Sequence, residues 1–183
     1  MSTWKRCLMV QQAPYTLKKR LDNLEIRQYP QLLVAEVENS SEDRGFNILF
    51  NYINGDNSSR KKIPMTAPVI NSEKIAMTAP VITKQDSMAF VLPQHYNLQT
   101  VPQPNNPNVS IRLQKEATYA VLRFSGRSMP KSIQKHTQLL DELVSKHHLK
   151  PMSAHILMRY NSPFAPGFLR RNEIAVEIEE ITS

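Results

Sequence analysis

The chain has 183 residues, with 23 Lys and Arg against 16 Asp and Glu, and 40% of its residues are apolar. This composition excludes a disordered chain, and the length predicts a single core, because a chain of this size buries about two-thirds of its unfolded surface on folding. The single cysteine, Cys7, excludes an intramolecular disulfide and any cysteine-based zinc or iron–sulfur site, and it fits a reducing compartment best.

Residues 1–21 form a basic N-terminal segment in which five Lys and Arg precede the first acid, Asp22. The segment offers one short helical face, made of Trp4, Cys7, Leu8 and Gln11. Such a face is compatible with organelle targeting or with binding at a membrane surface, but Pro14 ends it early. No stretch approaches the roughly 18 apolar residues of a membrane span. We therefore expect a loose basic tail over 1–21 and a soluble, cytoplasmic domain over 22–183.

Two segments have the apolar spacing of amphipathic helices. In the first, the i, i+3, i+4, i+7 positions of one face are Phe46, Leu49, Phe50 and Ile53. Ser40 or Ser41 can cap its start, so we expect a helix over 42–54 whose apolar face is turned to a sheet or groove. In the second, the apolar face comprises Ile133, Leu140, Leu143 and Val144. Pro130 suits its start and Pro151 its end, which predicts a helix over 130–148.

Alternation with a period of two predicts strands in the rest of the chain, at 24–27, 34–38, 89–92, 109–113, 118–124, 154–160 and 174–178. A connection rich in Pro and Asn separates two of these strands, between 92 and 109. The order of helices and strands indicates an α+β domain with two similar β-α-β-β halves.

An eight-residue repeat lies in the middle of the chain, where IPMTAPVI (63–70) recurs as IAMTAPVI (75–82). A strand pair, or a loop leading into a strand, is the physical interpretation, because two copies cannot build a solenoid. Met65 and Met77 are adaptable apolar side chains that can contact a flat ligand or simply fill the core.

The positive charge does not predict a nucleic-acid protein, because its clusters are small and scattered and no known binding module is recognisable. An enzyme is not expected either. The sequence lacks a Gly-x-Ser-x-Gly elbow, a phosphate-binding glycine-rich loop and an acid pair with opposed protonation states.

Five motifs, in chain order, resemble the SOUL haem-binding protein family. They are EIRQYP (25–30), the doubled MTAPVI repeat, FVLP (90–93), RFSG (123–126) and FLRRNEI (168–174). The resemblance covers roughly 22–180. It implies a distorted antiparallel β-barrel made from two β-α-β-β repeats with two flanking helices. It also implies a soluble, non-enzymatic protein, which we expect to be a monomer, that binds haem or a related tetrapyrrole.

The family's ligand site is a shallow apolar groove between the first helix and the loop before the RRNE motif, here 162–169. Carried onto this sequence, the porphyrin faces would be supplied by Phe46, Phe50, Met65, Phe164 and Phe168. Cations for the propionates would come from Arg60, Lys61, Arg170 or Arg171. The two helix phenylalanines can equally be core residues. Arg170 and Arg171 can equally be structural, by pairing with Glu173 or by binding backbone carbonyls.

Iron ligation departs from the family pattern. Gln28 stands where some members carry a histidine proposed as the iron ligand, and a neutral amide is a poor replacement. His136 and His147 lie near the apolar face of the second helix and are expected to be structural. We therefore predict haem without an assigned metal ligand. Two alternatives remain open, a sensor of aromatic small molecules that resembles bacterial effector-binding domains, and a protein-interaction module.

Overall fold

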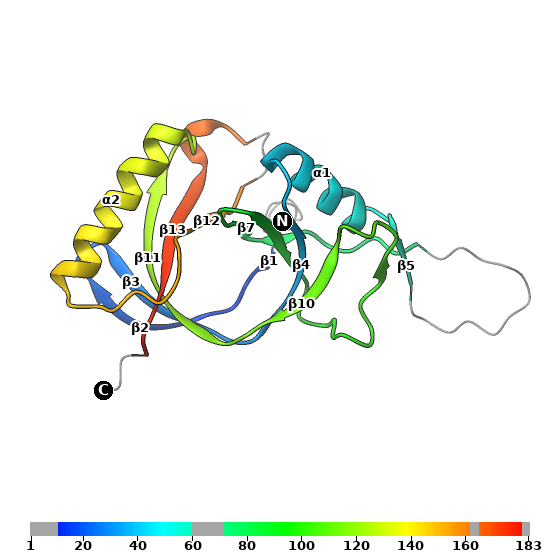
Figure 1. The fold of residues 1–183 in the computed structure, drawn as a ribbon, viewed down its shortest axis with the longest axis horizontal. Coiled ribbons are helices and arrows are strands. Elements are labelled where there is room, and N and C mark those ends of the chain that lie inside the picture. The colour runs from blue at the N-terminus through cyan, green and yellow to red at the C-terminus, as the bar shows by residue number, and fades with distance from the viewer. Residues whose placement is uncertain (1–10, 60–71, 162–164, 181–183) are drawn as a thin grey trace, which may run out of the picture.

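Two helices and one large curled sheet make up the described part of the chain (Figure 1). The computed structural model describes residues 11–59, 72–161 and 165–180. The helices are α1 (Glu42–Ile53) and α2 (Pro130–Lys146), and a short 3-10 turn, η2, covers Gly167–Leu169. The strands are β1 (Gln11–Gln12), β2 (Thr16–Leu21), β3 (Leu24–Tyr29), β4 (Leu32–Glu38), β5 (Asn57–Ser58), β6 (Thr78–Ala79), β7 (Val81–Thr83), β8 (Ser87–Val91), β9 (Gln103–Pro104), β10 (Ser110–Gln114), β11 (Ala117–Ser125), β12 (Ile156–Arg159) and β13 (Arg171–Ile178).

The main sheet of the described residues has nine strands in the order β10-β4-β8-β7-β12-β13-β11-β3-β2, all antiparallel to their neighbours. The unit β4-α1-β7-β8 is repeated as β11-α2-β12-β13, and the two units meet where β7 pairs with β12. The α+β class and the two β-α-β-β repeats are therefore confirmed. The sheet curls, but its edge strands β10 and β2 do not pair with each other, so it forms a half-barrel and not a closed barrel.

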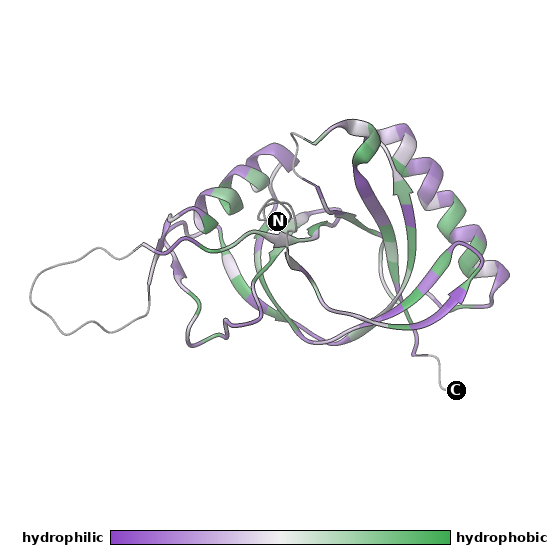
Figure 2. Ribbon diagram, turned by 180° about the vertical axis from the view of Figure 1, so that it is seen from behind, coloured by the Kyte–Doolittle hydropathy of each residue, from purple (hydrophilic) through white to green (hydrophobic). Residues whose placement is uncertain are grey.

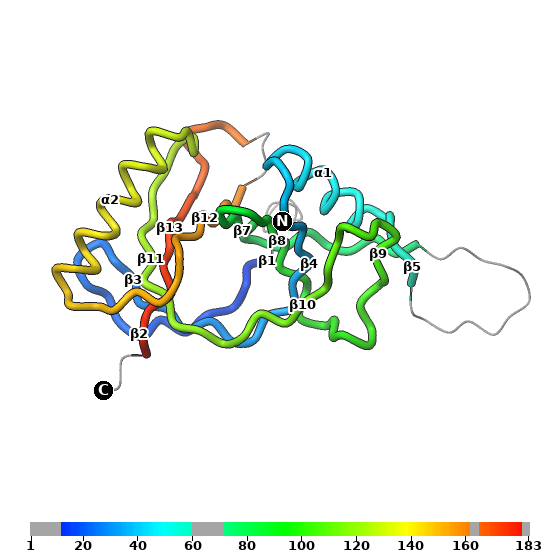
Figure 3. Tube along the Cα trace, viewed as in Figure 1, coloured from blue at the N-terminus to red at the C-terminus, as the bar shows by residue number. Residues whose placement is uncertain are grey.

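The two halves are also linked by the path of the chain. Strand β3 lies in the second half and the next strand, β4, in the first, while β10 and β11 cross in the opposite direction (Figure 3). The second half is therefore built from two chain segments, β2–β3 and β11–β13, which flank the first half in the sequence.

Apolar side chains cover both faces of the sheet. On β11, Ala120 and Leu122 pack beneath α2, whereas Tyr119 and Val121 point to the concave face. A similar cluster lies beneath α1, around Leu49 and the facing strands β4 and β8. Figure 2 shows apolar residues along the strands and polar residues on the outer turns of both helices. This two-sided burial explains why strands such as β4 are almost continuously buried.

The predicted helices are confirmed to within two residues at each end, but the predicted cap of α1 is not. Ser41 is the N-cap and makes no side-chain hydrogen bond to the helix, and the buried Oγ of Ser40 has no partner among the described residues. Neither helix of the described residues combines the length and the apolar content that crossing a bilayer requires.

The boundary of the predicted tail is wrong. Residues 16–21 form β2, which pairs with β3 at the edge of the sheet. The apolar alternation rule could not find this strand, because its side chains are exposed on both faces and backbone pairing to β3 holds it in place. Residues 1–10 lie outside the described residues.

The second copy of the repeat, 75–82, runs through β6 and β7 and is the loop leading into a strand that the sequence suggested. Its Thr78 and Ala79 pair in parallel with β1. Ile75 is buried beneath α1 and Ile82 on the concave face, so the copy contributes to both faces of the sheet. The first copy, 63–70, lies outside the described residues.

Candidate functional site

A groove of about 340 Å3 lies between the first half of α1 and the ends of β12 and β13, and we name it the α1 groove. Its apolar walls come from four parts of the fold: Phe46 on α1, Met77 before β6, Val81 on β7 and Met88 on β8. Its polar rim includes Arg159 at the end of β12, Arg170 after η2, and Glu42 and Asp43 on α1. The groove is thus apolar on the sides of α1 and the sheet and charged at its rim.

Phe46 is held in place by two ring contacts. It stacks on Phe50 with ring centroids 5.8 Å apart and an interplanar angle of 14°, and it meets the buried ring of Phe90 edge to face at 5.5 Å. Phe50 is 42% exposed, while Leu49 and Ile53 are buried beneath the helix. The predicted apolar face of α1 is therefore confirmed for the sheet side, and Phe50 forms its solvent edge.

The cations of the rim are oriented by hydrogen bonds. Arg159 forms an ion pair with Glu42 at 2.7 Å and donates to Ser128 Oγ at 3.2 Å and Thr83 Oγ1 at 3.3 Å. Arg170 donates through Nε to the carbonyl oxygen of Ala165 at 2.9 Å. Arg159 therefore joins α1 to the sheet across the groove.

Arg171 belongs to a different arrangement, a buried network around Glu173. It donates to the Glu173 carboxylate at 2.7 Å, and Arg27 does so from β3 at the same distance. The two structural roles that the sequence left open are both observed, since Arg171 pairs with Glu173 and Arg170 binds a backbone carbonyl.

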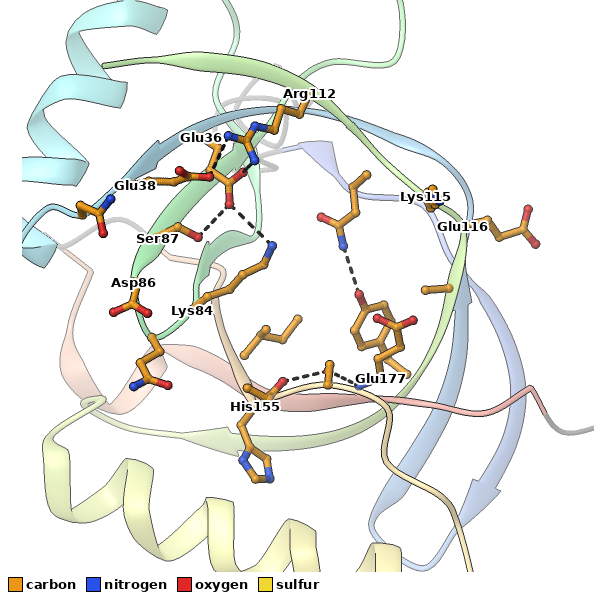
Figure 4. Close-up of a pocket in the computed structure, with 18 residues that line it drawn as sticks. Glu36, Glu38, Lys84, Asp86, Ser87, Arg112, Lys115, Glu116, His155 and Glu177 are labelled. Atoms are coloured by element: carbon orange, nitrogen blue, oxygen red, sulfur yellow. Dashed lines mark hydrogen bonds and ion pairs between the residues drawn. The ribbon is translucent and has the colours of Figure 1, made fainter. Parts of the chain in front are cut away.

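A larger cavity, of about 750 Å3, opens on the concave face, and we name it the concave cavity (Figure 4). Most of its lining residues are polar, and they include five acids (Glu36, Glu38, Asp86, Glu116 and Glu177) against three Lys and Arg (Lys84, Lys115 and Arg112). Glu36 is only 7% exposed. Ser87 donates to it at 2.7 Å, and Lys84 and Arg112 lie at 3.6 Å, as the dashed lines in Figure 4 show. The charge of Glu36 is thus balanced within the protein.

Tyr119 and His155 also line this cavity. Gln114 donates to the Tyr119 hydroxyl at 3.1 Å, and burial, together with the charge of Glu177, raises the pKa of Tyr119. His155 points away from the cavity in Figure 4 and contacts Asp141 on α2 at 2.7 Å. A polar, water-accessible cavity of this kind does not suit an apolar disc.

The structure separates the predicted site residues. Phe46 and Arg170 line the α1 groove, and Phe50 stacks behind Phe46. Phe168 is 78% exposed and is not one of the lining residues. Arg60, Met65 and Phe164 lie outside the described residues.

Sequence reasoning missed Met88 and Arg159 as lining residues. It considered Met77 either as a contact to a flat ligand or as a core residue, and did not assign it to the groove. Met77 is the counterpart of Met65 in the second copy of the repeat, so the repeat itself carried a usable signal. Arg159 carried no such signal, because its place in the groove depends on the pairing of β12 with β7 and on the ion pair to α1.

The histidines of α2 have structural partners. His136 stacks on Phe124 with centroids 4.2 Å apart, and His147 contacts Asp22 at 3.0 Å. In the part of the chain that the structure describes, no three His, Cys, Asp or Glu side chains are grouped so as to hold a metal ion. Gln28 donates to Glu116, a residue that lines the concave cavity. Gln28 is not one of the residues lining the α1 groove.

The fold defines the class as α+β half-barrels built from two β-α-β-β repeats. Among solved structures, the C-terminal domain of EcmrR is similar with a TM-score of 0.56 and 11% identity, covering 91% of this chain and 99% of that chain. A hydrolase from Listeria innocua has a TM-score of 0.52 and 11% identity, covering 88% of this chain and 94% of that chain. At such identities the likeness shows the fold alone.

A family model described as SOUL heme-binding protein matches residues 10–177. The chain therefore belongs to the SOUL heme-binding protein family. The match begins before β2, in agreement with the corrected domain boundary. No curated protein matches the chain.

Proposed function

We propose that the chain binds haem or a related tetrapyrrole in the α1 groove and acts as a monomeric, non-enzymatic carrier, buffer or sensor. The observation that carries the proposal is a single groove that combines the Phe46 ring and two methionine side chains with arginines at the rim. A porphyrin needs such a combination, because its ring is apolar and its propionates are anionic.

The residues present fit this ligand. Phe46, Met77 and Met88 would contact the ring, and Phe50 would extend the aromatic wall into solvent. Arg170 and Arg159 would meet the propionates, although Glu42 already partners Arg159. The volume of about 340 Å3 is at the lower end for ligand pockets, so a porphyrin would remain partly exposed.

Bound haem would supply its own iron chemistry. No His or Cys is found among the described side chains that line the groove, and its sulfurs belong to Met77 and Met88. We therefore expect binding to depend on the ring contacts, and the spectrum of the hemin complex to be that of weakly ligated or five-coordinate iron.

Titration with hemin, followed at the Soret band, tests the proposal. The double variant Phe46→Ala, Phe50→Ala should weaken hemin binding at least tenfold. A tenfold loss of affinity corresponds to only about 55 Å2 of apolar area that is no longer buried, at about 25 cal/mol per Å2. Phe50→Ala alone should weaken it less and leave the fold intact, because Phe50 lies at the solvent edge.

The matched control is Leu113→Ala, whose side chain is as exposed as that of Phe50 and lies on β10, away from the groove. Hemin binding by this variant should not change. Replacement of His136 or His147 should also have little effect. A single histidine variant that abolishes the Soret shift, with the double Phe variant binding normally, would overturn the site.

The rim can be tested separately with hemin and its dimethyl ester, which lacks the carboxylates. Arg170→Gln should weaken binding of hemin but not of the ester, because a charge-assisted hydrogen bond needs the anion. Equal loss for both ligands would assign Arg170 a structural role only.

A second candidate function is that of a receptor for a polar small molecule in the concave cavity. The buried carboxylate of Glu36, on strand β4, favours this candidate. The sequence showed no acid on the apolar faces of the helices, and Glu36 supplies a carboxylate from the sheet instead. Lys84 and Arg112 already balance that charge, which places this candidate second. Thermal-shift screening with organic cations tests it, and Glu36→Gln should abolish any shift without changing hemin binding.

A further inference from the structure

The most exposed large apolar side chains of the described residues gather at one end of the molecule. Phe168 is 78% exposed, Leu169 62% and Met129 58%. Phe168 and Leu169 lie in η2, and Met129 immediately precedes α2. This end lies at the top of Figure 1, and η2, before β13, is apolar in Figure 2. Exposed apolar side chains that gather in this way mark a contact surface more often than isolated ones do.

The two loops that carry these side chains are joined to each other, and we name them together the apolar tip (126–129 and 166–170). The amide of Gly126 donates to the Arg170 carbonyl at 3.2 Å, and Asn172 Nδ2 donates to the Gly126 carbonyl at 2.8 Å. Gly167 lies directly against the Arg127 side chain, where an added Cβ would approach Cγ to 3.0 Å. The backbone of the tip is therefore held by hydrogen bonds and packing, and its apolar side chains are exposed on an ordered surface.

The charge around the tip is positive. The two stretches that supply it, 117–140 and 143–172, contain no Asp or Glu. Arg127, Lys131 and Lys135 are exposed beside the apolar side chains. Acids reach this end from α1, where Glu42 is paired with Arg159 at 2.7 Å and Asp43 lines the groove. Protruding apolar side chains with a basic surround are the pattern of a protein that binds an anionic lipid surface.

We propose that the apolar tip docks on an anionic membrane surface, with Phe168, Leu169 and Met129 in the boundary between headgroups and acyl chains and Arg127 and Lys131 at the lipid phosphates. A lipid surface is favoured over a protein partner, because three side chains are too few for a stable protein interface, which buries about 800 Å2 from each partner. Ser128 and Arg170 belong both to the tip and to the lining of the α1 groove, so docking would hold the groove next to the lipid. The inference does not depend on the ligand of the groove.

Vesicle sedimentation with the full ligand-free chain tests the proposal. The chain should bind vesicles of phosphatidylcholine with phosphatidylserine, and bind vesicles of phosphatidylcholine alone much more weakly. The double variant Phe168→Ser, Leu169→Ser should reduce partitioning at least tenfold, because two large apolar side chains no longer leave water. The matched control, Leu98→Ser with Met152→Ser, removes two exposed apolar side chains elsewhere and should bind normally.

The charge arm uses Arg127→Gln with Lys131→Gln. This double variant should weaken binding roughly 30-fold, because each cation near an anionic surface contributes about 1 kcal/mol. A higher salt concentration should also weaken binding. Lys18→Gln with Lys19→Gln, on β2, removes the same charge and should change binding far less.

Several results would overturn the proposal. These are absence of binding to anionic vesicles, equal losses in the tip variants and their controls, or loss of binding only when Lys5 and Arg6 of the N-terminal segment are replaced. A dimer in size-exclusion chromatography that Phe168→Ser, Leu169→Ser converts to a monomer would instead assign the tip to contact between copies of this chain. Circular dichroism of every variant separates these outcomes from misfolding.

Discussion

Glu173 is a fully buried carboxylate whose acceptor positions are occupied by three side chains from three strands or their ends. Arg27 donates to both of its oxygens, at 2.7 and 3.0 Å, and Arg171 donates to Oε1 at 2.7 Å. The Tyr160 hydroxyl donates to Oε2 at 2.7 Å. Burial raises the pKa of Tyr160, and the charge of Glu173 raises it further. The network satisfies a charge that would otherwise be costly to bury.

Glu173→Gln should destabilise the protein by about 3–5 kcal/mol, because it removes the buried counter-charge that Arg27 and Arg171 share. Urea unfolding measures the change. Glu179→Gln is the matched control, since it removes one partner of the exposed Lys150–Glu179 pair and should cost less than about 1 kcal/mol. Similar losses in both variants would contradict the role of burial.

The same residue predicts a dependence of stability on pH. Burial alone would raise the pKa of Glu173, but the hydrogen bonds and charge of Arg27, together with the hydrogen bonds from Tyr160 and Arg171, outweigh burial, and the pKa is lowered. A carboxyl whose folded pKa is lowered contributes stability above its unfolded pKa of about 4.3 and loses it as the pH falls through the folded value. The difference in free energy of unfolding between the unmodified chain and Glu173→Gln should therefore be constant near neutral pH and shrink below about pH 4. A constant difference at all pH values would contradict this.

At the scale of elements, α1 divides its apolar face between the core and the groove. Leu49 is fully buried against β4 and β8, whereas Phe46 lines the groove and Phe50 meets solvent. One continuous stripe in the sequence thus serves two purposes.

Leu49→Ala should destabilise the protein by about 2–5 kcal/mol, the cost of a large cavity in a packed core. Phe50→Ala should cost much less, since its ring is already 42% exposed. Thermal unfolding compares the two. For hemin affinity the order should reverse, with Phe50→Ala causing the larger loss. If Leu49→Ala caused the larger loss in both stability and hemin affinity, the face would not have two functions.

Strand β2 shows what backbone pairing contributes without an apolar face. Removal of residues 1–21 should destabilise the protein on the order of 2–4 kcal/mol, because each backbone hydrogen bond contributes about 0.5–1.5 kcal/mol net and β3 would become an open edge. Removal of residues 1–10 leaves β1 and β2 in place and is the control in urea unfolding. Equal stability of the two truncated chains would show that residues 16–21 contribute nothing to the stability of the domain.

At the scale of the molecule, the two repeats share one sheet. Strand β7 pairs with β12, and the chain crosses between halves twice, at β3–β4 and at β10–β11. Arg27 and Glu173 add a buried ion pair between β3 and β13 within the second half. We therefore expect the repeats to behave as parts of one domain and not as two independent units.

We expect a single cooperative unfolding transition, with far-ultraviolet circular dichroism and tyrosine fluorescence giving the same midpoint. Leu49→Ala beneath α1 and Leu140→Ala beneath α2 should each lower that common midpoint. Two separable transitions, each moved by only one of the variants, would show that the halves fold independently.

Much of the fold could be predicted from the sequence, because apolar periodicity records which side of an element is buried. Both helices and the strands of the two repeats follow from it, except β7, which was suggested by the repeated motif at 75–82. The exceptions lack that record: β2 is exposed on both faces, and β5 and β9 are too short to show a period. For the site, Phe46 was predicted from the position of the family's groove on the first helix and Arg170 from the FLRRNEI motif, whereas neither source points to Arg159.

By itself, the sequence determined the class of fold, the family, the apolar face of α1 and the excess of positive charge. The tertiary structure alone decided that Met77, Met88 and Arg159 share one groove, that Glu36 is buried in the concave cavity, and that Phe168 and Leu169 are exposed beside Met129. The physical reason is the range of the interactions. Periodicity is a property of neighbouring residues, but a groove or an exposed tip forms where segments far apart in the chain pack together.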